Sequence, residues 1–265
     1  RGEPVIIQAY TTKLQAGLGL IPETEKLLQI WEPGISSRAL LDRALDNGDF
    51  PTMTARRLRN IVSEGFAPRY LVNDTQPATV LKLMQHVLSE EDRRQLYFLF
   101  TSRANPILAD FVRDIYWPQY TAGATALTKR DALNFVEDAV AEGKTTTPWS
   151  ESTKTRVSSY LLGACADFGL LGSMEAGGRK IESFRSSSIA TAFLAHDLHF
   201  RGLGDSAVLN HKDWRLLGLG ADDTLTELKQ IALRGEIIVQ SAAGLVQISW
   251  KHRNMEEFAH AVTHS

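Results

Sequence analysis

A helix with two contrasting faces is predicted over Thr52-Met-Thr-Ala-Arg-Arg-Leu-Arg-Asn-Ile-Val-Ser-Glu-Gly65. With about 100° of rotation per residue, one side collects the apolar and small residues Ala55, Leu58, Ile61, Val62 and Gly65. The other side collects Thr52, Arg56, Arg59, Asn60 and Ser63. Such side chains suit contacts with phosphates and base edges. They are equally typical of an ordinary solvated helix face, so this segment alone leaves both interpretations open.

The residues before this helix predict a helix-turn-helix order. Ser36 or Ser37 can cap a helix that runs to about Leu45, where Asn47-Gly48 ends it. A short connection then leads into the arginine-rich helix, which Ala67-Pro68 is expected to stop. Pro118 is expected to end a later helix that starts at Asn105-Pro106.

A second unit of this kind, with a hairpin added, is expected in the middle of the chain. Residues 128–142 predict an amphipathic helix, and Ser150 caps another that reaches Phe168. The outward face of that second helix carries Ser152, Thr155, Arg156 and Ser159. A hairpin around Gly177-Gly178 follows, with Arg179 and Lys180 expected at its tip. Helix, turn, helix, hairpin is the winged-helix order.

The rest of the chain predicts a mainly α-helical fold with small β-hairpins, of the α+β class. A further hairpin is expected from residues 236–240 and 245–250 around Ala243-Gly244. We expect a compact two-part body. Its parts are a helical N-terminal domain over residues 1–122 with the helix-turn-helix-like unit and a winged-helix-like C-terminal domain over residues 123–265.

Composition gives no global sign of nucleic-acid binding. The chain has 265 residues, a net charge of −2 and 23% charged residues, which is typical of a globular protein. Any such site must therefore come from local clusters of basic residues. Residues 50–70 hold Arg56, Arg57, Arg59 and Arg69 against the single acid Glu64. Residues 179–185 hold Arg179, Lys180 and Arg185 against Glu182.

Cysteine content and hydropathy indicate a cytoplasmic protein. Cys165 is the only cysteine, so no intrachain disulfide forms, and its inward position predicts a buried thiol. No apolar run approaches the roughly 18 to 20 residues that span a bilayer. We expect a cytoplasmic protein without a membrane segment; a monomer is favoured, and the sequence leaves the oligomeric state open.

Enzymatic and metal sites receive little support. His196 and His199 lie at i, i+3 on a predicted helix, but no set of converging ligands accompanies them. Gly143-Lys144-Thr145 resembles the end of a phosphate-binding loop, yet it follows a helix and lacks the upstream glycine. We therefore expect no catalytic residue, no metal ligand and no cofactor.

Several blocks resemble the BrxA family of bacterial BREX phage-defence systems. They are Tyr10-Thr-Thr-Lys-Leu-Gln-Ala-Gly-Leu-Gly-Leu-Ile21, residues 54–71 ending Phe-Ala-Pro-Arg-Tyr-Leu, Arg103-Ala-Asn-Pro-Ile-Leu-Ala-Asp-Phe-Val112, Trp149-Ser-Glu-Ser-Thr153, Ala166-Asp-Phe-Gly-Leu-Leu171, His196-Asp-Leu-His-Phe-Arg-Gly-Leu-Gly-Asp205 and Leu233-Arg-Gly-Glu-Ile-Ile-Val-Gln-Ser241. The resemblance implies a non-enzymatic, mostly helical, DNA-binding protein with other BREX components as partners. The family has also carried the label of a putative inner membrane protein, against which the hydropathy argues.

The resemblance and the two polar helix faces together predict a surface for double-stranded DNA that is bound mainly through phosphates. Its expected contacts are Arg56, Arg57, Arg59, Asn60, Ser63, Arg69, Ser152, Lys154, Thr155, Arg156, Ser159, Arg179 and Lys180. Two alternatives stay open. One is an interaction scaffold whose arginines dock another defence component. The other is an RNA binder or transcriptional regulator, although nothing in the sequence specifies a dimer or a half-site spacing.

Overall fold

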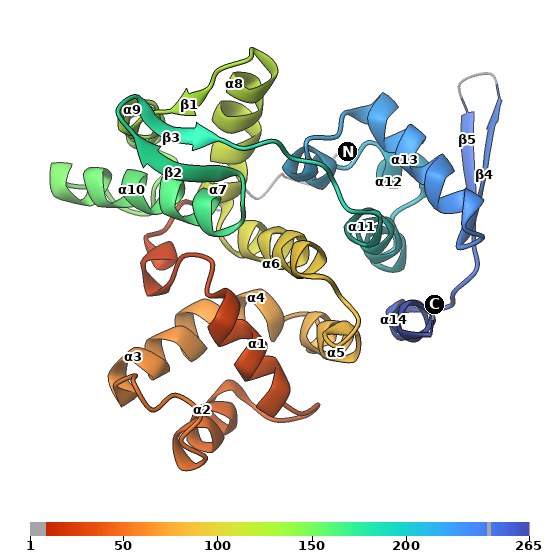
Figure 1. Cartoon of the computed structure of the whole chain (residues 1–265), viewed down its shortest axis with the longest axis horizontal. Helices are drawn as coiled ribbons and strands as arrows, with labels where there is room; N and C mark the ends of the chain where they lie inside the picture. Colours follow the sequence, from red (N-terminus) through yellow and green to blue (C-terminus); the bar gives the residue numbers. More distant parts are fainter. Residues whose placement is uncertain (1–8, 243–244, 265) are drawn as a thin grey trace. The chain divides into compact units, whose positions relative to one another are not determined.

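The computed structural model describes residues 9–242 and 245–264, and it is mostly helical (Figure 1). Of the described residues, 61% are helical, and the strands among them form one three-stranded and one two-stranded antiparallel sheet. The predicted class, mainly α with small β-hairpins, is confirmed. Within the described ranges, no helix combines the length and the apolar character needed to cross a membrane.

Contacts divide the chain into two units, each built from two separate stretches. The first unit is Arg1–Leu20 with Phe100–Phe184, and the second is Ile21–Leu99 with Arg185–Ser265. The domain boundary expected between residues 122 and 123 therefore falls inside the first unit. The sequence did not predict this division, because each unit joins two stretches that are far apart in the chain, and contacts between distant stretches leave no local sequence pattern.

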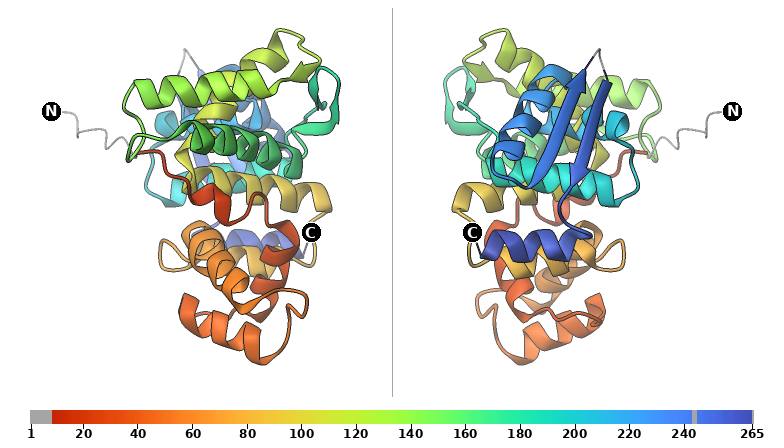
Figure 2. Two further views of the ribbon diagram at one scale, coloured as in Figure 1. Left: turned by 90° about the vertical axis from the view of Figure 1, so that its left-hand side faces the viewer. Right: turned by 90° about the vertical axis from the view of Figure 1, so that its right-hand side faces the viewer.

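The first unit holds a pair of packed helices against a small sheet. Its elements are η1 Lys13–Ala16, α7 Pro106–Phe111, η3 Val112–Tyr116, α8 Trp117–Thr121, β1 Ala126–Leu127, α9 Lys129–Ala141, α10 Glu151–Asp167, β2 Leu171–Glu175 and β3 Gly178–Ile181. The strands pair antiparallel in the order β1-β3-β2. Helices α9 and α10 lie side by side (Figure 2, left). The inner face of α10 buries Val157, Leu161 and Cys165.

Local signals explain where α9 and α10 begin and end. Thr128 and Asp131 form a capping box at the start of α9. The hydroxyl of Ser150 accepts a hydrogen bond from the Thr153 amide at 3.3 Å, as expected for the cap of α10. Gly169 then takes a φ of 77°, which only glycine adopts without strain, and turns the chain toward β2.

The second unit is a larger helical assembly with one hairpin. Its elements are α1 Ile21–Ile30, α2 Ser37–Asp46, α3 Ala55–Asn60, η2 Ile61–Phe66, α4 Ala67–Tyr70, α5 Gln76–Met84, most of α6 Glu90–Ala104, α11 Ser188–Phe200, α12 Asp205–Leu209, η4 Lys212–Leu217, α13 Ala221–Leu233, β4 Ile237–Ala242, β5 Leu245–Trp250 and α14 Met255–Thr263. β4 and β5 pair antiparallel, and α14 packs on α5 (Figure 2, right). This hairpin confirms the prediction, although its expected turn at Ala243-Gly244 lies outside the described residues.

Two helices continue through prolines that were expected to stop them. η2 joins α3 to α4 across Pro68, and η3 joins α7 to α8 across Pro118. Both joining segments are π-helical: the Ala67 amide bonds to the Val62 carbonyl, and the Trp117 amide bonds to the Val112 carbonyl, each five residues back. A proline in a regular α-helix lacks an amide and clashes with the carbonyl four residues earlier. The wider π turn before each proline relieves that conflict, so the prediction of helix ends there is wrong.

Candidate nucleic-acid interface

The exposed face of α10 is polar and carries little charge. Ser152, Thr155, Arg156 and Ser159 are all exposed, as the sequence predicted. The Ser159 hydroxyl donates to the Thr155 carbonyl at 3.0 Å, so its remaining capacity is that of an acceptor. Arg156 forms no ion pair within the described part of the chain. It is therefore the available cation of this face.

Lys154 occupies a different environment from its neighbours. Its ammonium lies 2.5 Å from the Glu151 carboxylate, and its side chain is only 14% exposed. A phosphate that approached Lys154 would have to displace this partner. Lys154 therefore adds less positive charge to the surface of α10 than its sequence position suggested.

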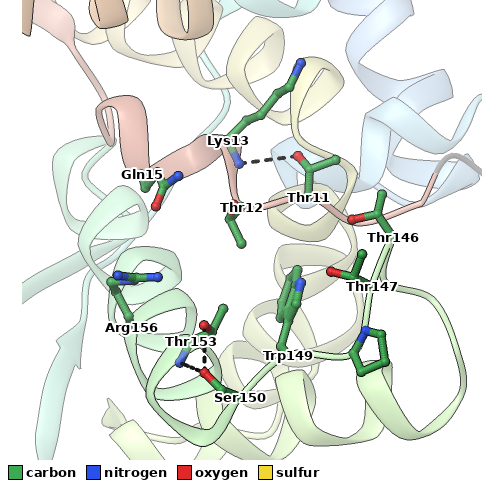
Figure 3. Close-up of a pocket in the computed structure, with 11 residues that line it drawn as sticks. Thr11, Thr12, Lys13, Gln15, Thr146, Thr147, Trp149, Ser150, Thr153 and Arg156 are labelled. Carbon is green, nitrogen blue, oxygen red and sulfur yellow. Dashed lines mark hydrogen bonds between the residues drawn. The ribbon is translucent and has the colours of Figure 1, made fainter. Parts of the chain in front are cut away.

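A polar pocket of about 540 Å³ lies beside the start of α10 (Figure 3). It is lined by Thr11, Thr12, Lys13, Gln15, Thr146, Thr147, Pro148, Trp149, Ser150, Thr153 and Arg156. Three segments meet here, namely the N-terminal residues 11–15, the connection before α10, and α10 itself. None of the lining residues is acidic. The pocket continues the polar face of α10, since Arg156 belongs to both.

Hydrogen bonds of Tyr10 and Gly19 hold the N-terminal segment in place. The Tyr10 amide donates to the Lys144 carbonyl at 2.7 Å, and the Tyr10 carbonyl accepts from the Thr146 amide at 3.1 Å. The Tyr10 hydroxyl donates to Asp110 at 2.6 Å. Further along, the Gly19 amide donates to the Asp167 carboxylate at 2.9 Å. The N-terminal segment that forms one wall of the pocket is thus held by hydrogen bonds at both of its ends.

The β2–β3 hairpin places its basic residues differently from the prediction. Its turn is Ala176-Gly177, between Glu175 at the end of β2 and Gly178 at the start of β3. Arg179 is half-buried and donates to the Gly172 carbonyl at 3.0 Å. Lys180 is paired with Glu182 at 3.0 Å. The prediction of a basic tip is wrong, because Arg179 and Lys180 lie along β3 and are already bonded, Arg179 to Gly172 and Lys180 to Glu182.

The arginine-rich helix α3 keeps most of its predicted surface. Arg56, Arg57, Arg59 and Asn60 of α3 are all exposed, as is Ser63 in the adjoining η2. Thr54 caps the helix by accepting from the Arg57 amide at 3.2 Å. In the part of the chain that the structure describes, neither Arg56 nor Arg59 forms an ion pair. Positive charge therefore gathers on this helix more than on α10.

Arg69 is a correction to the predicted contacts. It is only 2% exposed, and burial lowers the pKa of its guanidinium. Because the helix continues past Pro68, Arg69 falls on the same face as the buried residues Val62 and Phe66. A helix that stopped at Pro68 would have left Arg69 in an exposed loop. Arg69 in this position does not reach a ligand at the surface.

Comparison with known proteins supplies the family. The model of the BrxA family matches residues 8–196. The chain belongs to the BrxA family. Membership gives the protein a role in a BREX phage-defence system, whose other components are its expected partners.

Among solved structures, the chain is similar to an uncharacterized protein from Magnetospirillum magneticum. The TM-score is 0.57 at 15% sequence identity, and the match covers 72% of this chain and 94% of the other. At that identity the similarity concerns the fold alone. No protein with a curated description matches the sequence.

The two predicted contact sets of this BrxA-family chain belong to different units. The α10 set and the β2–β3 hairpin lie in the first unit, and the α3 set lies in the second. Sequence reasoning missed the pocket, including Thr12, Gln15, Thr147 and Thr153. The only local signal was the richness of both segments in threonine. Their contact through Tyr10 joins residues more than a hundred positions apart and has no periodic signature.

The histidines considered as metal ligands are packed among aromatic rings. His196 is fully buried, stacks on Phe258 with 4.4 Å between ring centroids, and lies with Nδ1 2.7 Å from the Ala192 carbonyl. Burial lowers the pKa of His196 to about 4, which keeps it neutral at pH 7. His199 stacks on Trp250. Across the described residues, no group of three His, Cys, Asp or Glu side chains is placed to hold a metal ion.

Lys144 and Cys165 take ordinary structural environments. The Lys144 ammonium pairs with Glu142 at 2.6 Å on the surface. Cys165 is buried, and that burial raises the pKa of its thiol. A buried thiol that stays protonated is a poor nucleophile, so neither residue indicates a reactive centre.

Proposed function

We propose that this BrxA-family protein is a non-catalytic, double-stranded DNA-binding component of its BREX system. The observation that carries the proposal is the order β1-α9-α10-β2-β3 with the sheet order β1-β3-β2. That order supports a winged-helix unit, in which the second helix of the pair would enter the major groove. Here that helix is α10, and its exposed face is polar.

The chemistry of α10 favours binding that tolerates many sequences. Arg156 is suited to a phosphate or to a guanine edge. Ser152 and Thr155 have short hydroxyls, which contact the DNA backbone more readily than they discriminate between bases. With one long side chain available to read base edges, the backbone phosphates would supply most of the affinity.

Helix α3 is proposed as a second contact. Arg56, Arg57 and Arg59 are exposed on α3, and the one acid in the helical segment 55–70 is Glu64 in η2. Arginine binds phosphate oxygens in a bidentate fork, so such a surface suits a polyanion without base readout. In the proposal α3 supplies electrostatic affinity and α10 supplies position.

A mobility-shift titration tests the proposal. The full chain would be mixed with two unrelated 30-base-pair duplexes, the RNA duplex of one sequence, and the corresponding single strands. We expect similar shifts with both DNA duplexes and weaker ones with the RNA duplex and the single strands. The absence of a shift with duplex DNA at low salt would contradict the proposal, and stronger binding of RNA would redirect it to RNA.

An interaction scaffold is the second candidate, because one observation favours protein contacts. Leu233, Ile238 and Leu245 in the second unit are 81%, 62% and 77% exposed. Exposed apolar side chains mark a protein-binding surface where they form a contiguous patch. Co-purification with another BREX component that Leu233→Ser and Ile238→Ser abolish, without any DNA shift of the wild type, would favour this candidate.

A further inference from the structure

We propose that the pocket beside α10 binds a phosphate group of the nucleic-acid backbone, so that residues 11–15 and 147–153 form part of the DNA interface. This inference rests on the proposed function and extends it. It adds Thr12, Gln15, Thr147 and Thr153 to the contacts, together with Arg156, which the face of α10 already supplied.

The lining offers donors without competing negative charge. Six hydroxyls, one amide side chain and the Arg156 guanidinium surround the pocket, and no lining residue is acidic. The nearest acid along α10, Glu151, is held by Lys154 at 2.5 Å. A ligand rich in acceptor oxygens fits this set of donors best, and a phosphate has that character.

Several of these donors are available for a ligand. In the described structure, the side chains of Thr12, Gln15, Thr147 and Arg156 form no hydrogen bond with other residues. Figure 3 shows Thr12 and Gln15 directed toward the side of Arg156 and Thr153. The side chain of Lys13 points away from them, so Arg156 is the cation of the pocket. No hydrogen bond within the protein therefore has to break before these four side chains contact a ligand.

The walls are held by buried residues and long-range hydrogen bonds. Leu14 is 1% exposed and Trp149 is 9% exposed, so each fixes its own segment in the core. Tyr10 is bonded to Asp110 and to the connection before α10, which fixes the entry to the N-terminal wall. A preformed site loses less conformational entropy when it binds a ligand.

The position and size of the pocket point to one nucleotide of a bound duplex. Arg156 lines the pocket and also stands on the exposed face of α10, so a duplex on that face would bring a backbone phosphate to the pocket. A volume of about 540 Å³ lies within the range of small-molecule sites, which leaves room for the adjoining sugar. A free phosphate compound shares this chemistry, and the experiment separates the two sources.

The test combines neutral and charged substitutions in the full chain. Thr12→Val, Gln15→Ala and Thr147→Val together remove three neutral donors, and Arg156→Gln removes the cation. The control is Gln119→Ala with Thr121→Val, exposed residues of α8 in the same unit that lie outside the pocket. Fluorescence anisotropy with a random-sequence duplex between 50 and 200 mM salt reports affinity, and circular dichroism melting checks folding. Binding of pyrophosphate, followed by ³¹P line broadening, reports the free-phosphate source.

We expect the triple variant to bind duplex about tenfold more weakly with an unchanged salt slope, since neutral donors release no counterions. Arg156→Gln should also reduce the slope by about one unit. If the wild type binds duplex and the triple variant matches the control, this inference is overturned and the proposed function stands. If duplex does not bind but pyrophosphate does, and only the wild type binds it, the source is a free phosphate and the proposed function fails. Binding of neither ligand overturns both.

Discussion

Helices α3 and α10, the two proposed DNA contacts, differ in their charge and in the elements around them. α3 carries three exposed arginines in a helix-turn-helix order, but no strand follows it directly. α10 has one available arginine, yet a sheet of order β1-β3-β2 and a hydroxyl-rich pocket frame it. The exposed arginines are therefore concentrated on α3, whereas the sheet and the pocket, the framework of the proposed interface, surround α10. Charge sets the strength of attraction and its salt dependence, whereas a framework sets where a duplex lies.

The largest effect is expected from removing the charge of α3. Arg56→Ala, Arg57→Ala and Arg59→Ala together should weaken duplex binding about a hundredfold and reduce the salt slope by about 2.7, because each phosphate contact contributes about 0.9. Titrations of duplex at several salt concentrations measure both quantities. Lys229→Ala, Arg234→Ala and Lys251→Ala, which remove three exposed charges from the same unit, form the matched control. Equal losses in both triple variants would mean that net charge, and not α3, attracts the duplex.

Acid should destabilise the unit that carries α3. All seven histidines lie in the second unit, and the pKa of His196 is lowered from 6.5 to about 4 by burial. The unfolded chain therefore binds more protons between these values, so stability falls as the pH drops from 6.5 toward 4 and levels off below. The shift corresponds to about 3 kcal/mol.

Urea unfolding at pH 7 and pH 4.5 checks this expectation. Most of that stability difference should be absent in His196→Gln, which cannot take up a proton on an imidazole. A wild type and variant that lose stability in parallel would show that carboxylates and other groups, not His196, govern the acid response.

The framework around α10 has a weak point at Gly178. Its φ is 130°, and a Cβ there would lie 2.5 Å from the Leu127 carbonyl oxygen. Gly178→Ala should therefore cost about 2 kcal/mol of stability and loosen the β1–β3 pairing. Duplex affinity should fall severalfold while the salt slope stays near the wild-type value, since no phosphate contact is removed. Gly177→Ala is the matched change, because no atom lies within 4 Å of its added Cβ. Similar melting temperatures for the two variants would refute this account of Gly178.

The smallest effect is expected at the hairpin. Lys180 is already paired with Glu182, so Lys180→Ala should change duplex affinity by less than about twofold. Lys180→Ala in the Arg156→Ala background tests whether Lys180 contributes to duplex affinity once α10 has lost its cation. A tenfold loss of duplex affinity from Lys180→Ala alone would show that the hairpin contacts the duplex, and would contradict its placement as a weaker contact than α10.

The parts of the fold with local signals were predictable from sequence. The ends of α10 were predictable from Ser150 and Gly169, and its course from the helical spacing of its apolar residues. The β2–β3 hairpin was predictable from Gly177-Gly178. Prolines misled the prediction twice, because a π turn depends on backbone geometry that residue propensity does not encode. The error at Pro68 carried over to Arg69, whose burial follows from the continued helix. The pocket was not predictable, since Tyr10 reaches residues 144–146 only through tertiary contacts.

The salt dependence of duplex binding by the wild-type chain tests the central claim most directly. If Arg56, Arg57, Arg59 and Arg156 each neutralise one phosphate, the logarithm of the binding constant should fall with the logarithm of salt concentration at a slope of about −3.6. Binding should be equally strong for unrelated sequences. A slope near zero, or no binding at 50 mM salt, would contradict the claim that this protein holds DNA through its phosphates.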